Sequence, residues 1–192
     1  MFNVCSILLF CSLILFAHTG EPPTSFGFFT GIKHPILGLD HLLAMLCVGM
    51  ISSRIGGKAV WQVPACFVVV MAMGCIMGFY GPKLSLLEPL ISLSVIVFGA
   101  LFLVPKLLTY PATFVTVGLF ALVHGVAHGI EMPIFVLPEI YIAGFMISTI
   151  MIHIFGVGIG ELINKLPKAV RITQITGGLL IIAGTVLLMN AL

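Results

Sequence analysis

Residues 34–52 read HPILGLDHLLAMLCVGMIS, two histidines and an aspartate that lead directly into an unbroken apolar run. A helix needs about 20 apolar residues to cross the hydrocarbon core of a bilayer. Ionisable side chains are costly to insert in such a helix, and where they occur they indicate a functional site by default. The stretch therefore predicts a membrane helix that carries a polar site.

The same hydrocarbon-like character extends through most of the chain. Of its 192 residues, 60% are hydrophobic and 7% are charged, and the mean hydropathy is +1.29. These values lie far outside those of a soluble globular domain. We therefore expect an all-α polytopic membrane protein whose surroundings are the lipid bilayer. The formal net charge of +2 is too small to indicate nucleic-acid binding.

Six apolar runs are separated by breaks that contain glycine and proline. We expect one compact transmembrane helical bundle with short connections and no extramembrane domain. The expected helices are Phe28–Ser52, Ala59–Tyr80, Leu86–Val104, Ala112–Met132, Ile140–Ile163 and Ile172–Leu192. Three of the runs contain glycines four residues apart, which predicts close helix packing. These pairs are Gly74 with Gly78, Gly125 with Gly129, and Gly156 with Gly160.

The first 20 residues form a separate segment. Its apolar core, Ile7–Phe16, has the length typical of a signal peptide. We expect a signal peptide over residues 1–17, with cleavage as late as residue 20, and a six-helix domain over residues 18–192. An uncleaved additional span is the alternative, because no Lys or Arg precedes the apolar core. Cleavage after Ala17 would expose the amine and imidazole of His18 as a further metal ligand.

Basic residues between the runs predict the orientation of the bundle. They concentrate in the first, third and fifth connections, which the positive-inside rule places in the cytoplasm. They are Arg54, Lys58, Lys106, Lys165, Lys168 and Arg171. We therefore expect a multi-pass protein of a bacterial inner membrane with both mature termini outside. A division into three plus three helices would give inverted halves, as in many transporters.

A second cluster of ionisable residues lies in the fourth run, where residues 124–131 read HGVAHGIE. His124 and His128 are four residues apart, so their imidazoles share a helix face about 6 Å apart along the axis and can reach one metal ion. Glu131 continues this face and could act as a third ligand, orient an imidazole or take up a proton. The alternative is that these histidines only form hydrogen bonds between helices.

The first cluster poses a geometric question. His34 and His41 are seven residues apart and would stand about 10 Å apart in an unbroken helix, too far for one ion. Either the helix breaks near Pro35 and Gly38, which is tolerated where backbone lines a cavity, or two successive sites exist. Asp40 is costly to bury as a carboxylate, and we expect a metal ion or His41 to be its partner.

Two points stay open on the residues alone. His153, in the fifth run, is either a further ligand along an ion path or a structural hydrogen-bond donor. Imidazole and carboxylate ligands suit Ni²⁺, Co²⁺, Zn²⁺ and Cu²⁺ alike, so the spacing does not identify the metal.

These two stretches resemble the HupE/UreJ family of hydrogenase and urease accessory membrane proteins, which are regarded as nickel permeases. The matching motifs are His-Pro-x-x-Gly-x-Asp-His-x-Leu-Ala-Met, from His34 to Met45, and Phe-Ala-x-x-His-Gly-x-Ala-His-Gly-x-Glu, from Phe120 to Glu131. The resemblance implies a permease, not an enzyme, that brings Ni²⁺ or Co²⁺ into the cytoplasm for urease or hydrogenase maturation. It implies that the metal-binding set is His34, Asp40, His41, His124, His128 and Glu131.

The sequence contains no Walker-type nucleotide-binding motif. We therefore expect facilitated diffusion or secondary transport and no resident catalytic cofactor. Two other functions stay open: an intramembrane metal hydrolase that uses the His-x-x-x-His pair, and a metal-binding accessory subunit that does not transport. The coupling ion, the downstream metalloenzyme and the oligomeric state, a homo-oligomer included, are left undetermined.

Overall fold

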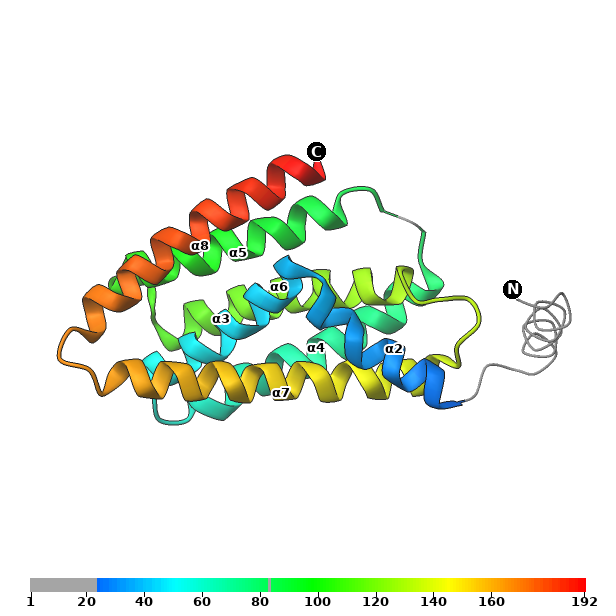
Figure 1. Cartoon of the computed structure of the whole chain (residues 1–192), viewed down its shortest axis with the longest axis horizontal. Helices are drawn as coiled ribbons and strands as arrows, with labels where there is room; N and C mark the ends of the chain where they lie inside the picture. The colour runs from blue at the N-terminus through cyan, green and yellow to red at the C-terminus, as the bar shows by residue number, and fades with distance from the viewer. Residues whose placement is uncertain (1–23, 83) are drawn as a thin grey trace, which may run out of the picture.

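The computed structural model describes residues 24–82 and 84–192, and both the predicted signal peptide and His18 lie outside these ranges. All regular secondary structure in the described ranges is helical (Figure 1). The α-helices are α2 (Thr24–Leu37), α3 (Leu39–Ile55), α4 (Ala59–Tyr80), α5 (Leu87–Leu103), α6 (Tyr110–Ile130), α7 (Pro138–Asn164) and α8 (Ala169–Ala191). A short 3-10 helix, η1 (Pro105–Leu107), joins α5 to α6.

Four of these helices, α4, α6, α7 and α8, are long and apolar enough to cross a membrane. Helices α2 and α3 meet the same criterion together, as one span bent by 80°. Helix α5 is apolar but has only 17 residues, a length of about 25 Å at 1.5 Å per residue. The predicted helices are found within about four residues of their expected ends, and the first of them, Phe28–Ser52, is broken, which is one of the two alternatives that the sequence left open.

The first span breaks at Gly38 and not at Pro35. Pro35 lies inside α2, whereas Gly38 has extended backbone dihedrals, φ −78° and ψ 109°, immediately before α3. The space beside Gly38 explains why glycine stands here: a Cβ atom would lie 2.9 Å from Nδ1 of His41. The break turns the chain so that the end of α2 and the start of α3 can contribute to one site.

Helices α4 and α6 pack closely through the glycine pairs that the sequence predicted. A Cβ atom on Gly125 would collide with the backbone carbonyl of Met71, and one on Gly74 would collide with the carbonyl of Leu122. Membrane helices gain no hydrophobic free energy by leaving the lipid, so they associate largely through the van der Waals contact that such close approach provides. The packing holds the histidine-bearing end of α6 against α4.

Helices α3 and α7 repeat the packing pattern of α6 and α4. Gly49 of α3 faces the carbonyl of His153 on α7, as Gly125 of α6 faces the carbonyl of Met71 on α4. The return contacts keep the same spacing: Gly156 faces Leu46, and Gly74 faces Leu122. The α3–α7 and α6–α4 interfaces therefore share one contact pattern, as expected if the first three spans correspond to the last three.

Helices α5 and α8 complete this relationship. Gly99 of α5 and Gly177 of α8 face each other, and a Cβ atom on either would approach the carbonyl of the other. A reciprocal contact is expected where a pseudo-twofold axis relates two corresponding helices of inverted halves. The three-plus-three division expected from the sequence thus has a counterpart in the packing, and Figure 1 shows α5 and α8 side by side.

Candidate metal centre

Three histidines from three helices converge at the break in the first span. One ring nitrogen from each of His34, His41 and His128 can be chosen so that all three lie within 4.8 Å of one another. The ring centroids of His34 and His41 lie 4.8 Å and 4.9 Å from that of His128. Bonds of about 2.0–2.1 Å to one divalent metal would require these nitrogens to approach to about 3–3.5 Å of one another, so the rings would have to move inward on binding. We call His34, His41 and His128 the histidine trio.

The trio is built by the ends of its helices. His34 lies in the last turn of α2, His41 in the first turn of α3 and His128 in the last turn of α6. His41 and His128 are buried, whereas the side chain of His34 is 25% exposed. His34 therefore forms the mouth of the site. The alternative of two successive sites along a straight helix is not needed, because the bend brings both histidines of the first cluster together.

Glu131 contacts the trio through His34. Glu131 directly follows the last residue of α6, and its backbone N–H still bonds the carbonyl of Ala127, so it lies on the helical path that carries His124 and His128. Its Oε2 lies 3.0 Å from Nε2 of His34. Burial raises the pKa of Glu131, but the hydrogen bond and charge of His34 outweigh burial and leave this pKa below its ordinary value. The carboxylate can orient the His34 ring and leave Nδ1 free for a metal.

Asp40 plays the same part for His41. Its Oδ1 accepts a hydrogen bond of 2.8 Å from the backbone N–H of His41 and lies 3.0 Å from Nδ1 of the same ring. The expectation that His41 is a partner of Asp40 is therefore confirmed. With Nδ1–H donating to a carboxylate, the lone pair of His41 is on Nε2, and Nε2 is buried with no hydrogen-bond partner in the described part of the chain. Carboxylate–histidine pairs of this kind fix the tautomer of metal ligands.

His124 lies next to the trio and not within it. Its ring centroid is 5.1 Å from that of His41. Nδ1 donates a hydrogen bond of 2.8 Å to the carbonyl of Phe120, one turn earlier in α6, so Nε2 carries the lone pair. The sequence predicted that His124 and His128 share one ion, whereas the structure groups His128 with the two histidines of the first span.

Unpartnered nitrogens are concentrated in this part of the molecule. Nε2 of His124 and both ring nitrogens of His128 are buried and lack hydrogen-bond partners among the described residues. Buried polar atoms nearly always have partners, because leaving one unpaired costs free energy. A divalent cation with open coordination positions would satisfy these lone pairs.

The structure adds Glu88 to the site, a residue that lies outside both sequence motifs. Glu88 lies in the first turn of α5, near enough to Glu131 for the two carboxyl groups to interact. Glu88 and Glu131 thus bring two acidic side chains close to His34 at the mouth. The available signal was position: Glu88 begins the third run at the membrane side where the fourth run ends.

His153 is not part of the trio. It is fully buried in α7, and neither ring nitrogen has a hydrogen-bond partner among the described residues. Its ring lies 5.1 Å from that of Phe67, whose ring is also 5.4 Å from that of His124. The side chain of Phe67 therefore lies between His153 and His124.

Comparison with known proteins gives two consistent matches. The family model described as HupE / UreJ protein matches residues 6–187 of the chain. The chain is 40% identical over 165 residues to Protein HupE of Rhizobium leguminosarum bv. viciae, a match that covers 85% of each sequence. No solved structure matches the chain.

Proposed function

The chain belongs to the HupE/UreJ family, and from this premise we propose that it carries divalent transition-metal ions, Ni²⁺ before Co²⁺, through a bacterial inner membrane into the cytoplasm. The observation that supports this most is the convergence of His34, His41 and His128 with buried, unpartnered nitrogens. The imported metal would supply urease or hydrogenase maturation. This proposal makes the protein a permease and not an enzyme.

The choice of metal rests on the family and on ligand chemistry together. Imidazole nitrogens suit Ni²⁺ and Co²⁺, but intrinsic affinity would favour Cu²⁺ over both. Selectivity then has to come from geometry and from which metals are available. Nickel is proposed here because of the family to which the chain belongs.

We further propose six membrane crossings after a cleaved signal peptide, with the bent α2–α3 pair as the first and α5 as the third. The basic end of α3 supports this orientation, because Arg54 donates a hydrogen bond of 3.0 Å to Asn164 at the end of α7. These two helix ends therefore lie together, at the opposite end of α3 from His41. The basic end would face the cytoplasm and the trio the outside.

The order of ligands suggests how an ion enters. Glu88 and Glu131 place negative charge at the mouth, where a hydrated cation would first be attracted. His34, partly exposed, would exchange the first water, and the buried His41 and His128 would replace others. Asp40 would keep His41 in the tautomer that presents a lone pair. The membrane potential supplies about 2.3 kcal/mol per charge per 100 mV for inward movement.

Uptake of radioactive nickel tests this proposal. Cells would express the wild type, His34→Ala, Asp40→Ala or His128→Ala at matched membrane abundance, with cobalt, zinc and copper as competitors. Glu139→Ala, an exposed change at the start of α7, is the control. We expect saturable uptake in the wild type and control and its loss in the other three. Metal binding by the purified wild type without any uptake would instead indicate the accessory, non-transporting function.

A further inference from the structure

His153 occupies a special place in the repeated packing. It stands in α7 where Met71 stands in α4, because each presents its carbonyl to the corresponding glycine of the neighbouring helix. The same correspondence relates Thr149 to Phe67, each four residues earlier. Thr149 Oγ1 lies 3.9 Å from Sδ of Met71, and the ring of His153 lies 5.1 Å from that of Phe67. If a pseudo-twofold rotation exchanges the two halves, the contact of Thr149 with Met71 becomes the contact of Phe67 with His153. Residues that contact their symmetry counterparts in this way lie close to the axis, so His153 lies beside it.

A position beside this axis is where a transported ion would pass. In transporters built from inverted halves, substrate sites lie near the middle of the membrane at the interface between the repeats. At the equivalent position of the other half stands Met71, which has no titratable nitrogen. The histidine is therefore not a requirement of the packing, because the same packing is made with a methionine.

The imidazole of His153 is also unexplained by its surroundings. The side chain is 1% exposed, and both ring nitrogens lack a hydrogen-bond partner among the described residues. A histidine kept for structural hydrogen bonding would be expected to make one. The lone pair of the neutral ring is therefore available to a metal ion.

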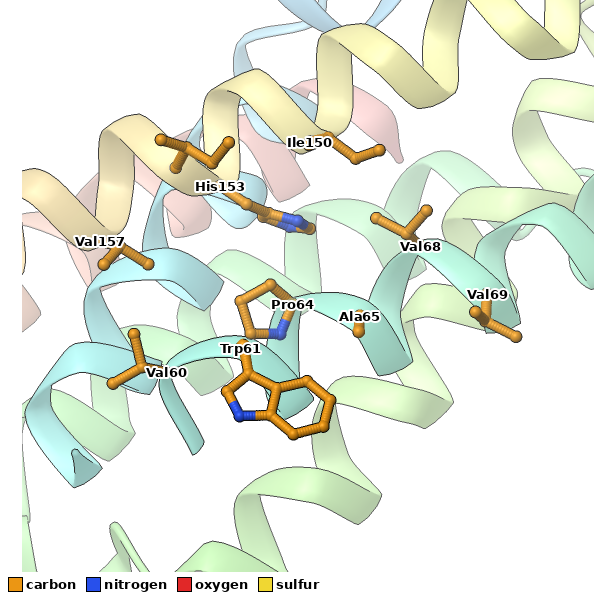
Figure 2. A pocket seen from close by; sticks show the side chains of 10 residues that line it. Val60, Trp61, Pro64, Ala65, Val68, Val69, Ile150, His153 and Val157 are labelled. Atoms are coloured by element: carbon orange, nitrogen blue, oxygen red, sulfur yellow. The ribbon is translucent and has the colours of Figure 1, made fainter. Parts of the chain in front are cut away.

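A groove between α4 and α7 provides room at this point. Figure 2 shows the His153 ring beside Pro64 and Val68, at a groove of about 450 Å³. Its lining is almost entirely apolar, and the Val60 carbonyl, which Pro64 cannot bond for lack of an N–H, accepts a hydrogen bond of 3.4 Å from Oγ of Ser52. Among the side chains that line the groove, the imidazole of His153 alone offers a metal ion a lone pair.

We propose that His153 is a second, transient ligand for the transported ion, deeper in the membrane than the histidine trio, and that the ion reaches it from His124 past the ring of Phe67. This inference rests on the proposed function. The rings of His124 and His153 both lie against the ring of Phe67, so passage of an ion from one histidine to the other would require the Phe67 ring to move.

The test separates capture of the ion from its passage. The purified full chain would be titrated with Co²⁺ to measure binding, and the same preparation, in liposomes, would be assayed for Ni²⁺ uptake. The variants are His153→Leu and His153→Gln, with Ile154→Ala as a control that alters the same groove without removing a nitrogen. We expect both His153 variants to bind Co²⁺ as the wild type does and to lose uptake by about tenfold or more, as for other supporting metal ligands.

Three results would overturn the inference. One is wild-type uptake in both His153 variants, and another is an equal loss of uptake in Ile154→Ala, which would assign the effect to groove packing. The third is loss of Co²⁺ binding in both His153 variants, which would make His153 a support of the outer site. Failure of the wild type itself to take up nickel would refute the proposed function. That result differs from the three above, which all concern variants compared with an active wild type.

Discussion

The imidazole Nε2 of His34 lies 3.0 Å from Oε2 of Glu131, although 97 residues separate them in the chain. The contact joins the end of α2 to the residue that follows α6. It closes the mouth of the histidine trio, and it ties the bent first span to the helix that supplies His128. The arrangement of the site therefore depends on a contact between His34 and Glu131 that no short sequence pattern can predict.

Replacing Glu131 with Gln should weaken metal binding by about 10–100-fold, the usual effect of removing a partner that orients a ligating histidine. The amide keeps the size of the side chain but loses its charge and the strength of the hydrogen bond to His34. Isothermal titration with Co²⁺ would measure the change. Glu139→Gln carries the same chemical change at the start of α7 and should bind as the wild type does. Equal affinity in both variants would show that the His34 contact does not serve the site.

Replacing Asp40 with Asn should also weaken Co²⁺ binding by about 10–100-fold, because the carboxylate holds Nδ1–H of His41. The effect should depend on the ring that it orients. In a His41→Gln background, Asp40→Asn should therefore add little, since two residues that act as a unit are not additive. Full additivity in this double-mutant cycle would mean that Asp40 acts on something other than His41.

The break in the first span tests a steric argument. Gly38→Ala places a Cβ atom 2.9 Å from Nδ1 of His41 and 3.4 Å from Oδ1 of Asp40, so the ring must move. We expect nickel uptake to fall by about tenfold or more, as for other changes that misplace a ligand, with helix content unchanged by circular dichroism. Gly158→Ala is the matched control, because a Cβ there meets nothing within 4 Å. Wild-type uptake in Gly38→Ala would contradict the role given to this glycine.

The helices were predictable because their cause is local. A long apolar run between glycine and proline breaks determines a membrane helix, and the glycine pairs of α4, α6 and α7 indicated where helices approach closely. The position of the break was not determined in this way. Both Pro35 and Gly38 are helix breakers, and only the contact of Gly38 with the His41 ring distinguishes them.

The sequence predicted which residues belong to the site better than it predicted which of them share one ion. The histidines stand out in an apolar sequence, but which of them share an ion depends on an 80° bend and on packing between distant helices. The pairing of Glu131 with His34 and the inclusion of Glu88 follow from that packing. Helical spacing placed His124 with His128, and the bend instead placed His128 with His34 and His41.

Close packing of α6 on α4 leads to a prediction about stability. Gly125→Ala would push a Cβ atom into the backbone of Met71, and overpacking of this kind typically costs about 1–3 kcal/mol. The unfolding temperature in detergent should fall by about 2–4 °C for each kcal/mol. Gly178→Ala, where a Cβ meets nothing within 4 Å, should not lower it. Equal unfolding temperatures in the two variants would argue against close contact between α4 and α6.

Metal binding should weaken as the pH falls from about 7.5 to 5.5, because an ordinary histidine has a pKa of about 6.5 and a protonated ring has no lone pair. Glu131 should not cause this loss. Burial raises the pKa of Glu131, but the hydrogen bond and charge of His34 lower it below its ordinary value of 4.5. A lowered carboxyl pKa means that the stabilising charge persists through this range and is lost only at lower pH.

Co²⁺ titrations at a series of pH values check this assignment. Wild type and Glu131→Gln should lose binding over the same pH interval, although the variant begins from a weaker affinity. Disappearance of the acid-sensitive step in Glu131→Gln would assign the titrating group to the carboxylate and not to a histidine.

The most direct measurement is X-ray absorption spectroscopy of Ni²⁺ bound to the purified protein, because it counts imidazole ligands around the metal. With His34, His41 and His128 as ligands of one ion, the wild type should show about three imidazoles at about 2.1 Å, and His128→Gln should show one fewer. A spectrum without imidazole ligation, or one that His128→Gln leaves unchanged, would contradict the histidine trio as the metal site.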